Sequence, residues 1–132
     1  MLNRQIVRAE FDRIRKRYFP DWKDFSQWQF GVKKLEDPKT RGEVLMNEKE
    51  IWINKSILPD ISLPLLGAVI AHEICHIVTH DDEQIHGPNW CEKMEKIAWQ
   101  AREEEREMAD EIYSMFKEWS LNLAFLKADK EK

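Results

Sequence analysis

The sequence contains little cysteine, little glycine and no long apolar run. Two cysteines among 132 residues, Cys75 and Cys91, are too few for the disulfide framework of a small secreted domain. We expect both to be buried packing residues. The longest nearly apolar stretch, residues 61–71, is too short to cross a bilayer, and the first residues lack the apolar core of a signal peptide. These absences argue against a secreted or membrane protein, and we expect a cytoplasmic one.

The composition is that of a globular protein. With 132 residues, 42% hydrophobic and 35% charged, the chain has the length of one domain with a core, so we expect a single domain over residues 1–132. The net charge of −4 is unevenly distributed: residues 1–41 hold eleven Lys/Arg against six Asp/Glu, and the remainder holds ten against nineteen. Such asymmetry can indicate an interaction surface.

Residues 2–18 have the spacing of an amphipathic helix, with Asn3 as a cap and Pro20 beyond its end. Its apolar positions recur three and four residues apart at Val7, Phe11, Ile14 and Tyr18. The opposite face is basic, and aromatic residues follow at positions 22, 25 and 28. One interpretation is a solvated face beside core aromatics. The other is a DNA-contacting surface on which unpaired bases stack, and the residues leave both open.

Three short segments after this helix have the composition and alternation of β-strands. They cover residues 28–32, 43–46 and 51–54, and polar residues 47–50 join the last two. We expect them to form a small antiparallel sheet of about three strands. A sheet edge can hold an extended peptide by main-chain hydrogen bonds, but the sequence does not indicate which strand would do so.

Two further helical segments follow. Ser62 is the expected N-cap of a helix over residues 63–78 that is apolar nearly all round, as a buried central helix is. Another helix begins at Pro88, and neither Gly nor Pro interrupts residues 89–126. One unbroken helix of that length would be about 57 Å long at about 1.5 Å per residue. We therefore expect a bend near residues 102–107 and a C-terminal helix over about 104–126, or else a protruding helix used for self-association.

Two histidines lie four residues apart within the apolar helix. Residues at this spacing share one face, so the imidazoles of His72 and His76 can reach the same metal ion. The carboxylate of Glu73 can reach a water on that ion without binding the ion itself. This His-Glu-x-x-His arrangement is that of zinc hydrolases. Unpaired His and Glu would be costly in so apolar a helix, which favours a metal site over a chance occurrence.

A catalytic zinc site needs a third protein ligand beside its open position. His80 continues the histidine row, but eight residues of straight helix separate it from His72 by about 12 Å at about 1.5 Å per residue. Residues 79–85 are polar and acidic enough to leave the helix and turn back. His86, directly before the helix start at Gly87-Pro88, is therefore the better candidate.

The run from His72-Glu73-Ile74-Cys75-His76 to His86-Gly87-Pro88-Asn89-Trp90 resembles the SprT-like zinc metallopeptidase family, which includes the Spartan proteases. Members share His-Glu-x-x-His, a variable loop and His-Gly-x-x-aromatic, and the specific match covers about residues 57–98, the expected core of the metal site. The resemblance implies an α+β, zincin-like fold, zinc held by His72, His76 and His86, and Glu73 as catalytic acid–base. It also implies proteolysis, in the best-known members of proteins crosslinked to DNA.

We therefore expect a zinc metalloendopeptidase that acts on polypeptides, with DNA-associated proteins as one substrate class. Zinc would lower the pKa of its bound water, and Glu73 would take the proton and later deliver it to the leaving amine. The competing interpretation is a DNA-binding or regulatory module with a structural zinc, although no fourth ligand is evident. Two details stay open: a downstream glutamate, Glu92 or Glu95, as third ligand, and Tyr113 or His80 as oxyanion donor.

Overall fold

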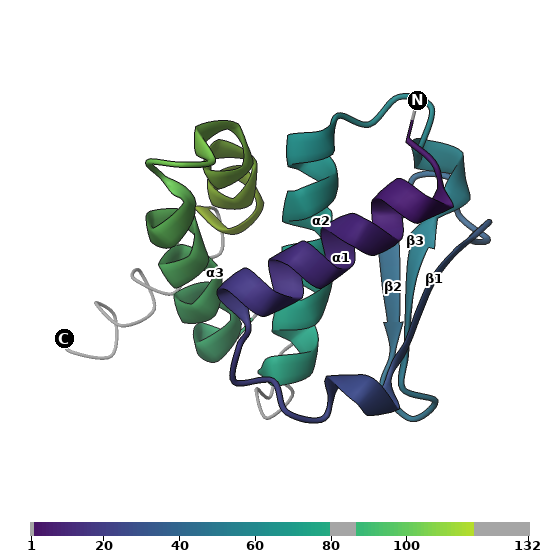
Figure 1. Cartoon of the computed structure of the whole chain (residues 1–132), viewed down its shortest axis with the longest axis horizontal. Helices are drawn as coiled ribbons and strands as arrows, with labels where there is room; N and C mark the ends of the chain where they lie inside the picture. The colour runs from purple at the N-terminus through teal and green to yellow at the C-terminus, as the bar shows by residue number, and fades with distance from the viewer. Residues whose placement is uncertain (1, 80–86, 118–132) are drawn as a thin grey trace, which may run out of the picture.

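Helix α2 (Leu63–Val78) runs through the middle of the fold, as Figure 1 shows. The computed structural model describes residues 2–79 and 87–117. Helix α1 (Arg4–Tyr18) crosses α2 diagonally, and the sheet lies to one side of α2, while α3 (Pro88–Ala101) and a further helix over residues 106–117 lie to the other (Figure 1). The predicted fold class, α+β and mainly helical with one small sheet, is confirmed.

Helix α1 forms as its apolar spacing predicts. The side-chain oxygen of Asn3 accepts a hydrogen bond from the Ile6 backbone N–H at 2.9 Å, and the helix ends before Pro20. All four predicted apolar positions are buried. The aromatics that follow pack on this face: Trp22 is 6% exposed and lies edge-on to Phe11, and Phe11 stacks on Phe30 with ring centroids 4.0 Å apart. Most of the Trp22 ring surface is therefore buried in the core.

Helix α2 is buried over most of its length because few of its side chains are polar. Ser62 caps it by accepting from the Leu65 backbone N–H at 3.3 Å, and Pro64 lies in its first turn, where a missing N–H costs nothing. The chain leaves the helix at Thr79, whose backbone N–H still bonds the Cys75 carbonyl at 3.0 Å. The predicted bounds of this helix are confirmed.

The sheet contains β1 (Gln29–Lys33), β2 (Gly42–Leu45) and β3 (Glu50–Asn54) in the order β1-β3-β2. Strand β2 pairs with β3 in the antiparallel sense, but β1 pairs with β3 in parallel. The sheet is therefore mixed, and the prediction that it is antiparallel is wrong for one of its two pairings. Alternating burial is common to both kinds of pairing, so the pattern could not distinguish them.

The buried side chain of Asn54 supports the crossover that makes the parallel pairing possible. Its amide nitrogen donates to the carbonyls of Asp37 and Thr40 at 3.2 and 2.6 Å, and its oxygen accepts from the backbone N–H groups of Leu35 and Ser56. These bonds hold the connection between β1 and β2 across the end of β3. Strand β2 is thereby placed at the sheet edge, beside α2.

Helix α3 starts at Pro88 with Gly87 as N-cap, as predicted. Residues 102–105 interrupt the helical conformation, and residues 106–117 are helical again. The predicted bend near 102–107 is confirmed, and the alternative of one unbroken helix is wrong. The last part of the predicted C-terminal helix, residues 118–126, lies outside the described residues.

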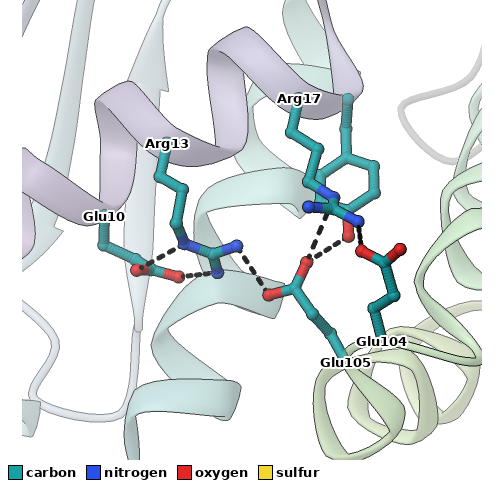
Figure 2. A network of polar contacts seen from close by, with 6 residues as sticks. Glu10, Arg13, Arg17, Glu104 and Glu105 are labelled. Atoms are coloured by element: carbon teal, nitrogen blue, oxygen red, sulfur yellow. Dashed lines mark hydrogen bonds and ion pairs between the residues drawn. The ribbon is translucent and has the colours of Figure 1, made fainter.

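A network of charged side chains joins this interruption to α1 (Figure 2). Arg13 contacts Glu10 at 2.5 Å and Glu105 at 2.6 Å, and Glu105 also accepts from the Tyr18 hydroxyl. Glu10 lies on the core side of α1 and is only 6% exposed, so Arg13 satisfies a carboxylate that would otherwise be costly to bury.

Among residues 2–79 and 87–117, we find no helix with the length and apolar character needed to cross a membrane.

Candidate metal centre

The structure brings the two histidines of α2 together. The Nε2 atoms of His72 and His76 lie 2.9 Å apart, and the ring centroids are separated by 4.6 Å. Two nitrogens bound to one tetrahedral zinc at about 2.05 Å would be about 3.4 Å apart, so a small side-chain adjustment suffices. Neutral imidazole nitrogens on one helix face are also donors that zinc prefers. The described residues therefore fit the first half of the predicted site.

Helix α3 places an indole ring against both imidazoles. Trp90 is fully buried; its ring lies 5.6 Å from the His76 ring at an interplanar angle of 16°, and 5.2 Å from the His72 ring at 75°. This position follows from the start of α3 at Pro88 and its packing against α2. Because the indole is large and enclosed, it restricts the rotation of both imidazoles.

The side chain of Glu73 lies against the edge strand β2. It is 7% exposed, and a Cβ atom at Gly42 of β2 would lie only 3.0 Å from its Oε1 and 3.1 Å from its Cγ. Burial, assisted by the negative charge of Glu43, raises the pKa of Glu73 to about 8. Such a carboxyl group can both accept and release a proton near neutral pH.

The predicted third ligand, His86, lies outside the described residues, as do His80 and the acidic residues 81–83. Within residues 2–79 and 87–117, no three His, Cys, Asp or Glu side chains form a group that could hold a metal ion. The alternative ligands Glu92 and Glu95 are described and do not form such a group with the histidines. His86 therefore stays a prediction, supported by the start of α3 directly after it.

Both cysteines behave as predicted packing residues. Cys75 and Cys91 are buried, and neither forms a disulfide within the described residues. Burial raises the pKa of the Cys75 thiol well above its usual range. Tyr113, the alternative oxyanion donor, is 56% exposed and packs edge-on to Phe116 on the helix over residues 106–117. None of these positions adds a metal donor to the histidine pair.

Comparison with known proteins places this arrangement in a family. The model of the SprT-like family matches residues 7–110. The chain belongs to the SprT-like family. The matched range of this SprT-like domain runs from α1 to the start of the helix over residues 106–117 and includes the histidine motif. No curated protein matches the chain.

A solved structure shares the fold. The crystal structure of the metallopeptidase zymogen of Methanocaldococcus jannaschii jannalysin superimposes with a TM-score of 0.57 at 14% identity, over 85% of this chain and 94% of that one. At this identity the likeness shows the fold alone, which this chain shares with that metallopeptidase zymogen.

The sequence motif did not indicate the role of Gly42. This glycine lies on a strand that is distant from Glu73 in sequence, and only the placement of β2 beside α2 brings the two together. A glycine at the start of a β-prone segment was the only local signal, since glycine in a strand can mark a close approach by another group.

Proposed function

We propose that this SprT-like domain is a zinc metalloendopeptidase. The observation that supports the proposal best is the convergence of the His72 and His76 imidazoles beside a buried glutamate on the same helix. In this proposal His72, His76 and His86 hold the zinc, and Glu73 is the catalytic acid–base. The described residues would supply two nitrogen donors and the base, and His86, which directly precedes Gly87 in the sequence, would supply the third donor.

Zinc, when bound, would polarise the scissile carbonyl and lower the pKa of a water molecule toward about 7. The Glu73 carboxylate would accept the proton of the attacking water and deliver it to the amine nitrogen that leaves. Burial raises the pKa of Glu73, so its carboxylate is a better proton acceptor than that of an exposed glutamate. Trp90 would keep the imidazoles in their orientation and exclude water from one side.

Strand β2 is the proposed substrate-binding edge. It is the antiparallel edge strand of the sheet, and its first residue, Gly42, faces Glu73. An extended polypeptide could pair with the free side of β2 by main-chain hydrogen bonds. Such pairing would bring a peptide carbonyl to the histidines whatever side chains the peptide carries, because only main-chain groups form these hydrogen bonds.

The decisive experiment compares the Glu73→Gln protein with the wild type. We expect the variant to retain zinc in metal analysis and to lose the cleavage of casein, because glutamine cannot accept the proton. His86→Ala should lower the zinc content, whereas the exposed pair Glu92→Gln and Glu95→Gln should leave it unchanged. Activity in the Glu73→Gln protein would contradict the assigned role. Full zinc content in His86→Ala would contradict the ligand set.

DNA-associated proteins as substrates are a separate proposal, supported by the basic first 41 residues and by the resemblance to Spartan proteases. Part of that charge is engaged within the fold: Arg13 and Arg17 contact Glu105, and Arg15 lies over the Phe25 ring at 3.7 Å. Exposed Arg4, Arg8 and Lys16 remain on the surface of α1. Binding of single-stranded DNA that weakens steeply with salt would support this proposal. If zinc is bound and DNA binds without any peptidase activity, the alternative of a regulatory module with structural zinc is correct.

A further inference from the structure

A cavity of about 710 Å³ opens beside the candidate metal centre. It is bordered by the C-terminal end of α2, the first turns of α3, the turn between β2 and β3, and the segment after α1. Ile77, directly after His76, and Asn89, directly before Trp90, both line it. Among the described residues, the cavity lining thus includes direct sequence neighbours of the centre, but neither His72 nor His76. We call it the lysine cavity.

Four ammonium groups from separate parts of the chain surround this cavity. They come from the segment after α1, from the β2–β3 turn and from α3, at Lys23, Lys49, Lys93 and Lys96. Its floor is apolar and aromatic, with Phe19, Trp22 and Trp28. The four lysines make the lining rich in donors, which favours a ligand that brings acceptor oxygens.

The backbone at Lys49 is unusual for a lysine. Its φ angle is 56°, the only positive value at a non-glycine residue among those the structure describes. Glycine or asparagine would adopt this conformation at lower cost, so a lysine here is costly for the fold alone. Its ammonium group donates to the Gln27 side-chain oxygen at 2.6 Å, which places it at the cavity wall. Conformational cost of this kind is often retained where a side chain has a function.

The lining also contains the carboxylates of Asp21, Asp24 and Glu92. A nucleic-acid backbone carries a negative charge on every nucleotide and would bring several of them near these groups, whereas a peptide with one acidic side chain brings a single charge. A polypeptide presents both N–H donors and carboxylate acceptors, so the mixture of lysines and carboxylates suits a peptide better. Met46, directly after β2, lines the cavity as well. A peptide paired with β2 would therefore reach it about 13 Å from Gly42, at about 3.3 Å per residue.

We propose that the lysine cavity is a substrate subsite that binds an acidic side chain of the polypeptide, a few residues from the bond that is cleaved. This inference rests on the proposed peptidase function, because it places the occupant on the same bound peptide. The acidic side chain would accept hydrogen bonds from Lys49 and from Lys96 of α3. Its aliphatic part would lie on the aromatic floor.

The test measures binding separately from cleavage. The zinc-loaded Glu73→Gln full-length protein is titrated into fluorescently labelled ten-residue peptides that differ only in glutamate or glutamine at each position in turn. At one or two positions, we expect glutamate to bind about fivefold more tightly than glutamine, the effect of one or two charge-assisted hydrogen bonds at a partly exposed site. Equal affinity at every position would overturn the proposal.

Lys49→Gly is the informative variant because glycine fits the positive φ angle, and a melting curve distinguishes a loss of preference from a loss of stability. Glycine accepts the positive φ angle, so the variant should melt no lower than the parent while its preference for glutamate falls to about twofold or less. Lys96→Gln should have a similar effect, and Lys39→Gln, at an exposed position outside the cavity, should leave the preference unchanged. An undiminished preference in both Lys49→Gly and Lys96→Gln would overturn the proposal.

Two further outcomes separate this inference from its alternatives. If a single-stranded oligonucleotide binds in a Lys49-dependent manner and the glutamate peptides do not, the cavity is a nucleic-acid site and the proposal is overturned. If the wild-type protein cleaves no peptide but the Lys49-dependent preference is present, the peptidase function fails while the subsite stands. If the wild type cleaves peptides with no glutamate preference, the subsite fails and the peptidase function stands.

Discussion

Replacing Gly42 with alanine tests whether the edge strand sets the position of the catalytic carboxylate. The added methyl would lie 3.0 Å from Oε1, 3.1 Å from Cγ and 3.2 Å from Cδ of Glu73. Ordinary contact begins near 3.4 Å, so the carboxylate must recede by about 0.4 Å. No described glycine has a positive φ angle, so the alanine backbone itself is unstrained, and the consequence falls on the Glu73 side chain.

The size of the effect follows from the sensitivity of proton transfer to position. A misplacement of about 1 Å can cost about 100-fold in rate, so a shift of about 0.4 Å should lower kcat about sixfold. KM should change little, because the methyl points toward Glu73 and not toward the free side of β2. The thermal midpoint should stay within a few degrees, since alanine in a strand offsets part of the steric cost by reducing the entropy of the unfolded chain.

Gly31→Ala is the matched control. It lies on β1, pairs with Trp52, and its added methyl would lie 2.7 Å from Cζ3 of that ring. The ring must move, which should cost about 1 to 3 kcal/mol of stability as overpacking does, yet the Glu73 carboxylate is untouched. We expect normal kcat per folded molecule, measured with a peptide substrate alongside the unfolding curve. Equal kcat in Gly42→Ala and wild type would refute the assigned contact.

Four other outcomes follow from the same structure. Trp90→Phe should weaken zinc binding about tenfold in a chelator competition, because partners that orient the metal ligands typically contribute 10- to 100-fold; unchanged affinity would mean that the indole does not orient the imidazoles. Arg13→Ala should lower the free energy of unfolding in urea by about 2 to 3 kcal/mol, because it leaves the buried Glu10 carboxylate unpaired. Arg8→Ala is the control: its ion pair with Asp12 is exposed and spans 3.5 Å, so the loss should be under about 1 kcal/mol. A thiol reagent should leave Cys75 and Cys91 unmodified at pH 8 until denaturant is added, since both are buried and the pKa of Cys75 is raised; rapid labelling of the native protein would contradict the packing. Zinc at 1,000 times its Kd should raise the free energy of unfolding by about 4 kcal/mol, so the protein treated with a chelator should melt at a lower temperature. Identical melting curves with the chelator and with excess zinc would contradict a metal site in the folded protein.

The helices were predictable because their signals are local. Asn3 and Ser62 cap α1 and α2 with their own side chains, and Gly87-Pro88 starts α3. Length made an interruption the expected outcome, since an unbroken helix would not fit a compact fold, but a protruding helix stayed an alternative. The proximity of His72 and His76 follows from helical periodicity and needs no tertiary information.

Other features depend on contacts between distant segments, which no local pattern reports. The parallel pairing of β1 with β3 requires the crossover that Asn54 holds, and an asparagine at a strand end reads as an ordinary turn residue. The contact between Glu73 and Gly42 depends on that same strand order. The lysine cavity also depends on the strand order, because this order places Lys49 near residues that follow α1. The ligand role of His86 stays a prediction.

Helix α2, which carries the histidine motif, makes close contacts on two of its faces, and substitutions on the two faces should have different effects. At Gly67, near its start, an added methyl would lie 2.8 Å from the Met108 sulfur and 3.0 Å from a Glu10 oxygen. Glycine there lets the buried carboxylate of α1 and the helix over residues 106–117 approach α2 together, so a substitution at Gly67 should act on stability. The Glu73 face meets Gly42 of the edge strand instead, so a substitution there should act on the carboxylate. The orientation of the histidine pair is thus set by packing that involves α1, β2 and α3. This dependence explains why a five-residue motif requires most of the described chain to hold its side chains in the orientation of a metal site.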